Sequence, residues 1–370
     1  MQVQVVDPSA YTPPYDHALC AALARAGVDV ELVTSRFLYG PVPRESGYRV
    51  NEWFYRAANR RGLAWRLRVP LKLLEHAPDM LRYRRHARGA DVVHYQWLDV
   101  QPLDARLLPP ARPRVLTAHD VVPREPKRGQ VAATRRIVRK MDAVVVHSER
   151  GAARLREELG VDSERVHVIP HGAFDYLTRQ ADEVSLPPEL AAVTGPVILF
   201  FGLIRPYKGI DVLLDAFQRV EGAELWVVGM PRIDMARLHR LAERAPGRVR
   251  FVERYVTDPE LPAFFRRADL VVLPYREIDQ SGVLYTALAF GKPLVLSRVG
   301  GFAEVADQHG AARLVTPGDP ASLAGAINGL LIDHEARARL GQAAADAAAG
   351  PYSWDAVAAR TLALYRDLVG

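Results

Sequence analysis

Two series of short runs rich in Val, Ile and Leu, each separated by helical patterns, constrain the fold of this chain more than any other sequence feature. The first series lies at residues 3–6, 30–33, 92–94, 115–117, 143–146 and 166–169, and the second at 197–201, 224–228, 249–252, 270–273, 294–297 and 313–315. Apolar runs of this kind are typical of parallel strands that helices cover on both faces. The sequence therefore predicts an α/β protein of two Rossmann-like, doubly wound domains.

Helical patterns and one irregular stretch suggest the domain boundaries. The helical patterns include residues 15–26, 151–159, 210–219, 259–266, 283–290 and 320–331. A stretch with Pro187-Pro188 and few periodic apolar positions separates the halves. We predict an N-terminal domain over 1–175, an interdomain linker over 176–195 and a C-terminal domain over 196–350. The last segment, 351–370, is predicted to be a helix that can pack on either half, including back on the N-terminal domain.

The composition is that of an ordinary globular protein. Of the 370 residues, 49% are hydrophobic and 25% are charged, which excludes an intrinsically disordered chain. The first residues show no basic stretch followed by an apolar run, and no apolar segment approaches the roughly 20 residues that span a bilayer. Cys20 is the only cysteine, so an intrachain disulfide is impossible. We expect a cytoplasmic protein.

The net charge of +6 is unevenly spread, with an excess of arginine between Arg36 and Arg88. Aromatic and aliphatic side chains, among them Trp53, Trp65 and Leu67, lie between these arginines. Such a surface can lie on an anionic membrane, where each basic residue gains ~1 kcal/mol, or it can be a solvated helical face. The first alternative would place the protein on the inner face of the cell membrane. No nucleic-acid partner is expected, because a pI near 9.4 without a recognised module is a weak indication.

A loop in the second half carries residues suited to binding an anion. Residues 200–209 contain Gly202, Arg205 and Lys208 and lie between a predicted strand and a predicted helix. In an open α/β sheet, ligands bind beyond the carboxyl ends of the strands. Gly202 lets the backbone approach a bulky anion, while Arg205 and Lys208 place two cations beside a helix N-terminus that itself favours phosphate.

A second loop follows the predicted strand at 270–273. Ser281, Gly282 and Val283 open the next helix and can offer successive backbone N–H groups to a phosphate or a sugar. Candidates to bind sugar hydroxyls in the same loop are Glu277, Asp279 and Gln280. Either loop alone is also compatible with a solvated strand–helix connection. Together they are more specific.

Together these segments resemble the family 4 glycosyltransferases, retaining enzymes of the GT-B fold that use nucleotide sugars. The resemblance rests on the Arg205-x-x-Lys208-Gly209 loop, on residues 286–293 with their Gly-Lys-Pro turn, and on residues 299–305 and 315–320. In the first half, residues 117–120 and 168–172 fit the same family. The resemblance covers nearly the whole chain and implies two Rossmann-like domains that face each other across a cleft.

The resemblance implies that Arg205 and Lys208 bind the donor diphosphate. Cations fixed there stabilise the charge that grows on the leaving diphosphate, so they contribute more in the transition state than in the ground state. Such a site can work without a divalent metal, and the sequence has no Asp-x-Asp pair and no zinc motif. We predict no metal and no cofactor besides the donor substrate. Tyr255 and Val256, after the predicted strand at 249–252, are the expected shelf for the nucleobase.

One departure concerns the two glutamates that the family carries seven residues apart. Aligned on the Gly-Lys-Pro turn, these positions hold Ile278 and Thr286. In the family, the second glutamate binds the ribose hydroxyls, to which Thr286 can make only a weaker contact. The first glutamate contacts the sugar in the family, and here Glu277 or Asp279 can replace it after a one-residue shift. The departure puts the identity of the donor in doubt and admits a degenerate protein that only binds nucleotide sugars.

The first half is expected to bind the acceptor. His119 lies where the family has a histidine that faces the donor, so we predict a catalytic role for it, although a lone histidine after a strand is more often structural. The candidate acceptor-binding residues follow two predicted strands and combine aromatic with polar side chains: Tyr15, Asp16, His17, Gln96, Trp97 and Asp99.

The sequence thus predicts a retaining hexosyltransferase. It would move a hexose from a nucleotide-diphosphate sugar to a hydroxyl of a glycan, a lipid-linked glycan or a small natural product. The alternative is a catalytically degenerate nucleotide-sugar-binding protein.

Overall fold

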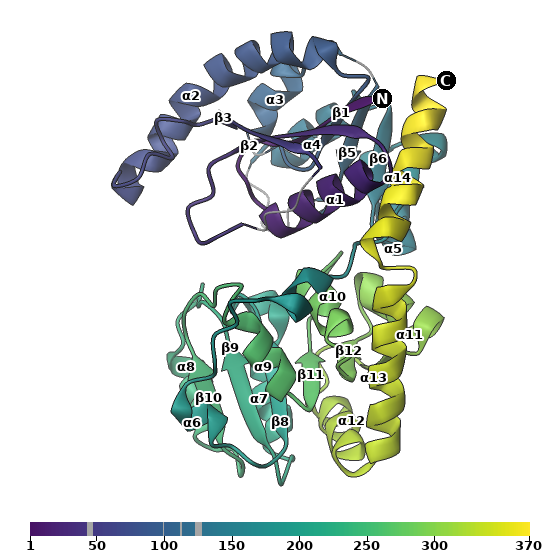
Figure 1. Cartoon of the computed structure of the whole chain (residues 1–370). Helices are drawn as coiled ribbons and strands as arrows, with labels where there is room; N and C mark the ends of the chain where they lie inside the picture. The colour runs from purple at the N-terminus through teal and green to yellow at the C-terminus, as the bar shows by residue number, and fades with distance from the viewer. Residues whose placement is uncertain (43–46, 99, 112, 123–127) are drawn as a thin grey trace. The chain divides into compact units, whose positions relative to one another are not determined.

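The computed structural model describes the chain except for residues 43–46, 99, 112 and 123–127. The chain forms two compact units. Unit 1 comprises Met1–Gly172 and Trp354–Gly370, and unit 2 comprises Ala173–Ser353. Each unit contains one parallel sheet surrounded by helices (Figure 1).

The sheet of unit 1 has seven strands in the order β3-β2-β1-β4-β5-β6-β7, all parallel. Its central strands β4, β5 and β6 are buried at every position, because helices cover both of their faces. The strands are β1 (Gln2–Asp7), β2 (Asp29–Ser35), β3 (Arg49–Phe54), β4 (Val92–Tyr95), β5 (Arg114–Thr117), β6 (Ala143–Val146) and β7 (Val166–Val168). The helices are α1 (Pro13–Arg25), α2 (Trp65–His86), η1 (Ala87–Gly89), α3 (Gln101–Leu107), α4 (Gln130–Val138), α5 (Glu149–Leu159), η2 (Ser163–Arg165) and α14 (Trp354–Val369).

The sheet of unit 2 has six parallel strands in the order β10-β9-β8-β11-β12-β13. The order reverses at β8, with β9 on one side and β11 on the other, so β8 lies at the switch point where such sheets bind ligands. The strands are β8 (Val197–Phe201), β9 (Glu224–Val228), β10 (Val249–Val252), β11 (Leu270–Leu273), β12 (Leu294–Ser297) and β13 (Ala312–Val315). The helices are η3 (Asp175–Arg179), α6 (Pro188–Ala191), η4 (Pro206–Lys208), α7 (Ile210–Phe217), α8 (Ala236–Ala242), α9 (Leu261–Arg267), α10 (Gly282–Ala289), α11 (Gly300–His309), α12 (Pro320–Ile332) and α13 (His334–Ala349).

The boundaries of the units differ from the predicted ones. The segment expected as a linker, 176–195, contains most of η3 and all of α6, and its Leu177 and Leu190 are buried in the core of unit 2. The last helix, α14, belongs to unit 1, which is one of the two placements expected for residues 351–370. It packs on α1, where Arg25 Nη2 lies 2.8 Å from Asp355 Oδ1, and its Tyr365 hydroxyl lies 2.5 Å from His94 Nδ1.

The prediction of two parallel α/β domains is confirmed. One strand was missed: β3 pairs with β2 at the edge of the sheet and begins with exposed residues, so no apolar run marked it. The edge position explains the pattern, since an edge strand needs less apolar cover than a central one.

Candidate functional site

The first candidate donor loop begins where β8 ends. Gly202 has φ +114°, and a methyl group there would lie 2.9 Å from Lys208 Nζ and 3.2 Å from Val283 Cγ2. The glycine thus leaves the space into which the Lys208 side chain reaches. Lys208 is buried, and its Nζ lies 4.9 Å from the centre of the Tyr275 ring, at cation–π distance. The ammonium group is therefore fixed over the carboxyl end of β8.

Arg205 lies three residues earlier in the same loop. Its side chain is half-buried, and its Nε is buried without a hydrogen-bond partner among the residues that the structure describes. A guanidinium N–H that is shielded from water costs free energy unless an acceptor reaches it. An anion with several oxygens, such as a diphosphate, supplies such an acceptor.

Two close approaches fix this loop to the second one. Gly209 has φ +65°, and a methyl group there would lie 2.1 Å from the carbonyl oxygen of Pro274. Arg276 Nη1 donates to Pro206 O at 2.8 Å, and both of its Nη atoms donate to the Asp211 carboxylate at 2.9 Å. Burial alone would raise the pKa of Asp211, but the hydrogen bonds and charge of Arg276 outweigh it and hold that pKa below its usual value.

The sequence did not single out Arg276 or Tyr275. Both follow β11 directly, at the carboxyl edge where functional side chains gather, and this position was the available signal. Arg276 holds the first loop and Tyr275 lies beneath Lys208, so both support the two predicted cations.

The second loop packs against the start of α11. A methyl group at Gly300, where φ is +47°, would lie 1.8 Å from the carbonyl oxygen of Ile278. At Gly301 it would lie 2.5 Å from Gln280 Nε2. The consecutive glycines therefore let the loop lie directly on the helix. The loop then enters α10 through Ser281, which is buried and whose Oγ lies 3.4 Å from the Tyr275 hydroxyl.

At the two positions that lack the family's glutamates, the side chains make contacts inside unit 2. Ile278 is buried, and the Thr286 hydroxyl donates to Gly282 O at 3.0 Å within its own helix. Of the acids beside position 278, Glu277 is exposed and Asp279 is buried.

The expected nucleobase shelf consists of one exposed and one buried side chain. Tyr255 is 42% exposed, whereas Val256 is buried. Behind them, the Tyr176 hydroxyl donates to Asp258 Oδ2 at 2.7 Å and ties η3 to this loop. The exposed phenol ring is thus presented beyond the carboxyl end of β10 by an anchored loop.

In unit 1, His119 lies in a cluster of rings beyond the carboxyl ends of the strands. Trp97 stacks on it with the ring centres 5.0 Å apart and 13° between the planes, and Tyr15 meets it edge-on at 4.7 Å. His119 Nδ1 lies 3.1 Å from His147 Nε2, and His119 Nε2 lies 3.1 Å from Gln96 Oε1. The sequence missed His147, although it follows β6 as His119 follows β5.

The histidines of this cluster are neutral at physiological pH. Burial, followed by the neighbouring imidazoles of His147, His171 and His94, holds the pKa of His119 well below its usual range. Burial lowers the pKa of His147 to about 4 and, together with His147, that of His94 to about 3. The cluster therefore offers polar groups without adding positive charge.

The candidate acceptor residues on α1 are all buried. Tyr15 contacts the rings of His119, His147, His171 and Trp354, and the His17 Nδ1 lies 2.5 Å from the Tyr48 hydroxyl. Asp16 is 1% exposed, and burial, followed by the charge of Asp7 and a hydrogen bond with it, raises its pKa well above the usual value. Burial therefore favours the protonated form of the Asp16 carboxyl group.

The residues after β4 extend the ring cluster. The Trp97 indole N–H donates to Thr12 Oγ1 at 2.9 Å. The exposed Tyr11 ring lies beside the Trp97 ring, with the ring centres 4.4 Å apart. Gln96 is buried beside His119. Asp99 lies outside the described residues.

Comparison with known proteins agrees with this arrangement. Residues 195–333 match the model described as "Glycosyl transferases group 1", and residues 15–173 match "Glycosyltransferase Family 4". A D-inositol 3-phosphate glycosyltransferase of Xylanimonas cellulosilytica is 31% identical over 94% of this chain and 89% of its own. The chain belongs to glycosyltransferase family 4. A similarly named protein of Catenulispora acidiphila is 33% identical over 62% of this chain, and the match spans 57% of the relative's length.

The GT-B fold expected of a family 4 chain is also confirmed. The structure of HepE from Anabaena, in complex with UDP and glucose, aligns with a TM-score of 0.75 over 100% of both chains at 20% identity. At this identity the likeness concerns the fold alone.

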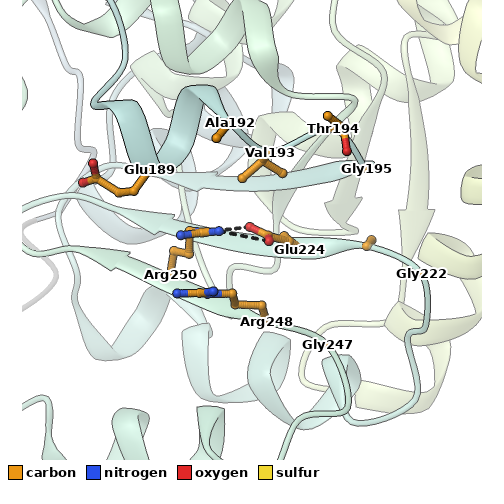
Figure 2. Close-up of a pocket in the computed structure, with 11 residues that line it drawn as sticks. Glu189, Ala192, Val193, Thr194, Gly195, Gly222, Glu224, Gly247, Arg248 and Arg250 are labelled. Atoms are coloured by element: carbon orange, nitrogen blue, oxygen red, sulfur yellow. Dashed lines mark hydrogen bonds and ion pairs between the residues drawn. The ribbon is translucent and has the colours of Figure 1, made fainter.

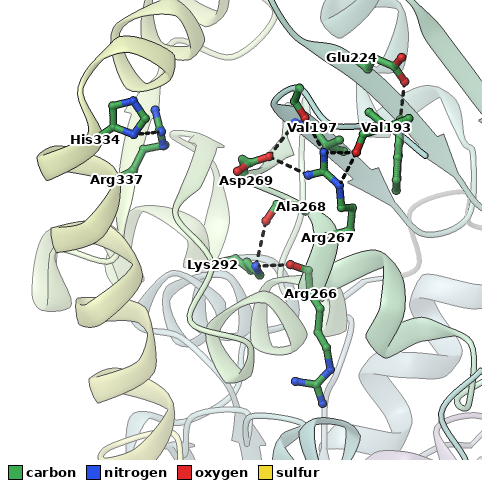
Figure 3. Close-up of polar contacts among 12 residues, drawn as sticks. Val193, Val197, Glu224, Arg266, Arg267, Ala268, Asp269, Lys292, His334 and Arg337 are labelled. Carbon is green, nitrogen blue, oxygen red and sulfur yellow. Dashed lines mark hydrogen bonds and ion pairs between the residues drawn. The ribbon is translucent and has the colours of Figure 1, made fainter. Parts of the chain in front are cut away.

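The Gly-Lys-Pro turn, one of the family 4 features, has a structural role here. Lys292 Nζ donates to Arg266 O at 3.0 Å and to Ala268 O at 2.9 Å, at the end of α9 (Figure 3). The nearby Arg267 guanidinium contacts Asp269 and the carbonyl oxygen of Val193 (Figure 3). This lysine therefore holds the chain before β11 and is separate from the donor loops.

A pocket in unit 2 lies away from the donor loops. It is lined by Glu189, Thr194, Glu224, Arg248 and Arg250, with Glu224 paired to Arg250 (Figure 2). These residues precede or begin β8, β9 and β10, so the pocket lies at the amino edge of the sheet. The two candidate donor loops lie at the opposite, carboxyl edge.

Proposed function

We propose that this chain transfers a hexose from a nucleotide-diphosphate sugar to a hydroxyl acceptor, with retention of configuration at the anomeric carbon. The observation that carries the proposal is the pair of cations in unit 2. Lys208 Nζ is held between Gly202 and the Tyr275 ring, and Arg205 in the same loop has a buried Nε without a partner in the described part of the chain.

These cations are suited to the diphosphate that leaves. When the bond between the sugar and the phosphate breaks, negative charge grows on the diphosphate oxygens, and fixed cations stabilise it without reorganisation. Family membership and the UDP and glucose bound to the similarly folded HepE support a nucleotide-sugar donor. Because the two cations can supply the positive charge, we propose that no divalent metal is required.

The remaining donor contacts follow from the loops. We propose that the backbone N–H groups of Ser281, Gly282 and Val283 bind the phosphate or sugar, and that Glu277, Asp279 and Gln280 bind sugar hydroxyls. Tyr255 and Val256 would support the nucleobase. Thr286 can only accept a hydrogen bond from the ribose, since its own proton goes to Gly282 O.

Substitution of the two cations tests the proposal. Arg205→Ala and Lys208→Ala are each expected to lower kcat/KM for transfer by roughly 10²–10³-fold, the range seen when one preorganised electrostatic contact is removed. Arg248→Ala, at the opposite edge of the same sheet, is the matched control and should leave transfer unchanged. Unaltered turnover and donor affinity in both loop variants would show that the mechanism is wrong.

The donor and the stereochemistry need separate measurements. A panel of UDP-, GDP- and TDP-sugars is screened for thermal stabilisation, because a ligand that binds only the folded state stabilises it by mass action. NMR of the product then gives the anomeric configuration. An inverted product would overturn retention while leaving transfer itself intact.

A degenerate binding protein is the second candidate, favoured by one observation. Ile278 and Thr286, where the family has glutamates, are committed to internal contacts. Calorimetry that detects donor binding, together with no hydrolysis and no transfer to any acceptor tried, would decide for this candidate.

We further propose that α2 docks unit 1 on an anionic membrane, which favours a lipid-linked acceptor. None of the described helices is long and apolar enough to cross a bilayer. The first turns of α2 extend away from the sheet of unit 1 (Figure 1). They expose large apolar side chains seven residues apart on one face of the helix, with Leu67 58% and Leu74 73% exposed. Its exposed basic residues, such as Arg66 and Arg85, complement anionic headgroups.

Vesicle binding tests this surface. Each large apolar side chain that enters the membrane contributes about 1.5–3 kcal/mol, so Leu67→Ser with Leu74→Ser should weaken binding to phosphatidylglycerol vesicles by roughly 100-fold or more. Ile332→Ser in unit 2, where the side chain is 82% exposed, is the control. Equal binding to phosphatidylcholine vesicles, or no loss in the double variant, would overturn the proposal.

A further inference from the structure

A line of polar contacts connects the backbone after β7 to His119. His147 is buried, and its Nδ1 lies 3.0 Å from the carbonyl oxygen of Ile169. Its Nε2 lies 3.1 Å from His119 Nδ1. On the other side of the second ring, His119 Nε2 lies 3.1 Å from the side-chain amide of Gln96.

The positions of the protons follow from these contacts. Both rings are neutral at physiological pH, because burial lowers their pKa values, and a neutral imidazole carries one N–H and one lone pair. A carbonyl oxygen only accepts, so the proton of His147 is on Nδ1 and its Nε2 is a lone pair. That lone pair accepts from His119 Nδ1–H, which leaves His119 Nε2 without a proton.

The Gln96 amide agrees with this assignment. The Gln96 Nε2 is buried and has no hydrogen-bond partner among the described residues. The Gln96 Oε1 faces the unprotonated Nε2 of His119. Exchanging the two amide atoms, which have nearly the same size, turns the amide N–H toward His119 and removes a contact between two acceptors. Gln96, His119 and His147 then form one chain of hydrogen bonds that runs toward the Ile169 carbonyl.

We propose that His147 is a positioning residue that holds His119 in the Nδ1–H tautomer, so that His119 meets a sugar hydroxyl as a neutral hydrogen-bond acceptor through Nε2. In the free protein the Gln96 amide donates to that lone pair, which a bound hydroxyl shares. Stacking by Trp97 fixes the plane of the His119 ring. In this assignment His119 supplies no positive charge to the diphosphate, and that charge comes from Arg205 and Lys208.

Nitrogen-15 NMR of the full chain tests the tautomer without reference to activity. We expect His119 to show a protonated Nδ1 and an unprotonated Nε2, with the signals assigned by their loss in His119→Gln. In His147→Leu, which is similar in bulk but cannot accept, the Nε2–H form should gain population. In His147→Gln the side chain can accept from His119 and donate to Ile169, so the wild-type pattern should persist. An Nε2–H tautomer in the wild type would overturn the proposal.

A transfer assay tests the consequence, which rests on the proposed function. Losing the preferred tautomer is expected to lower kcat about tenfold in His147→Leu, the worth of one hydrogen bond, with donor affinity by calorimetry unchanged. His147→Gln should stay within twofold of the wild type. Equal kcat values in the two variants would overturn the positioning role. A wild type without any transfer would instead refute the proposed function, while the NMR result would still decide the tautomer.

Discussion

Gly209→Ala should separate the two donor loops while leaving the rest of unit 2 in place. At φ +65° an alanine costs about 1–2 kcal/mol for the left-handed backbone alone. In addition, its methyl group would lie 2.1 Å from the Pro274 carbonyl oxygen, so the loops must move apart by roughly 1 Å or more to restore ordinary contact. Because Lys208 precedes Gly209 and Tyr275 follows Pro274, either movement displaces the ammonium group from its ring.

A displacement of about 1 Å in a catalytic group can cost on the order of 10²-fold in rate. We therefore expect kcat/KM for transfer to fall about 100-fold in Gly209→Ala, measured with the donor found by the thermal screen. Gly310→Ala is the control, because Gly310 has φ +63° and nothing lies within 4 Å of an added methyl group. It carries the same backbone cost without the clash. If the two variants transfer within threefold of each other, the close approach has no functional role.

Three further results are expected. Arg276→Met removes the link between the loops and should raise the KM for the donor about tenfold, whereas Arg298→Met, which breaks an exposed pair with Asp307, should not change it. Asp16→Asn should become progressively more stable than the wild type as pH rises. Burial and Asp7 raise the pKa of Asp16 in the folded protein above its value in the unfolded chain. The wild type therefore loses about 1.4 kcal/mol of folding free energy per pH unit as pH rises from the unfolded-state pKa to the folded-state pKa. Urea unfolding at several pH values measures this slope. Lys292→Met should lower the melting temperature without changing donor KM at a temperature where the variant is folded, since Lys292 Nζ holds the end of α9.

The sequence predicted the sheets because their strands are buried on both faces. A run such as 270–273 contains only apolar residues, and the structure buries all of them in β11. The edge strand β3 carries Arg49, Asn51 and Glu52, so its sequence resembles a loop, and only pairing with β2 makes it a strand. Local patterns therefore identify central strands better than edge strands.

The position of the candidate site was predictable from the sequence, but the residues that hold its loops and rings in place were not. Arg205 and Lys208 stand out because cations after a strand of an α/β sheet suit a phosphate. Arg276 is also a cation after a strand, yet it pairs with Asp211 and holds a backbone carbonyl, which depends on contacts between residues far apart in sequence. His147 likewise became significant only through its distance to His119.

Under the proposed function, the residues at 278 and 286 shift the binding energy for the donor toward its diphosphate. The carbonyl of Ile278 lies against Gly300, so the main chain at 278 is used to pack the loop on α11. Thr286 donates its proton to Gly282 O, so it keeps only weak acceptors for a ribose hydroxyl. A carboxylate accepting from a hydroxyl contributes about twice as much as a neutral acceptor does. Recognition of the donor should therefore depend more on Arg205 and Lys208 than on the ribose.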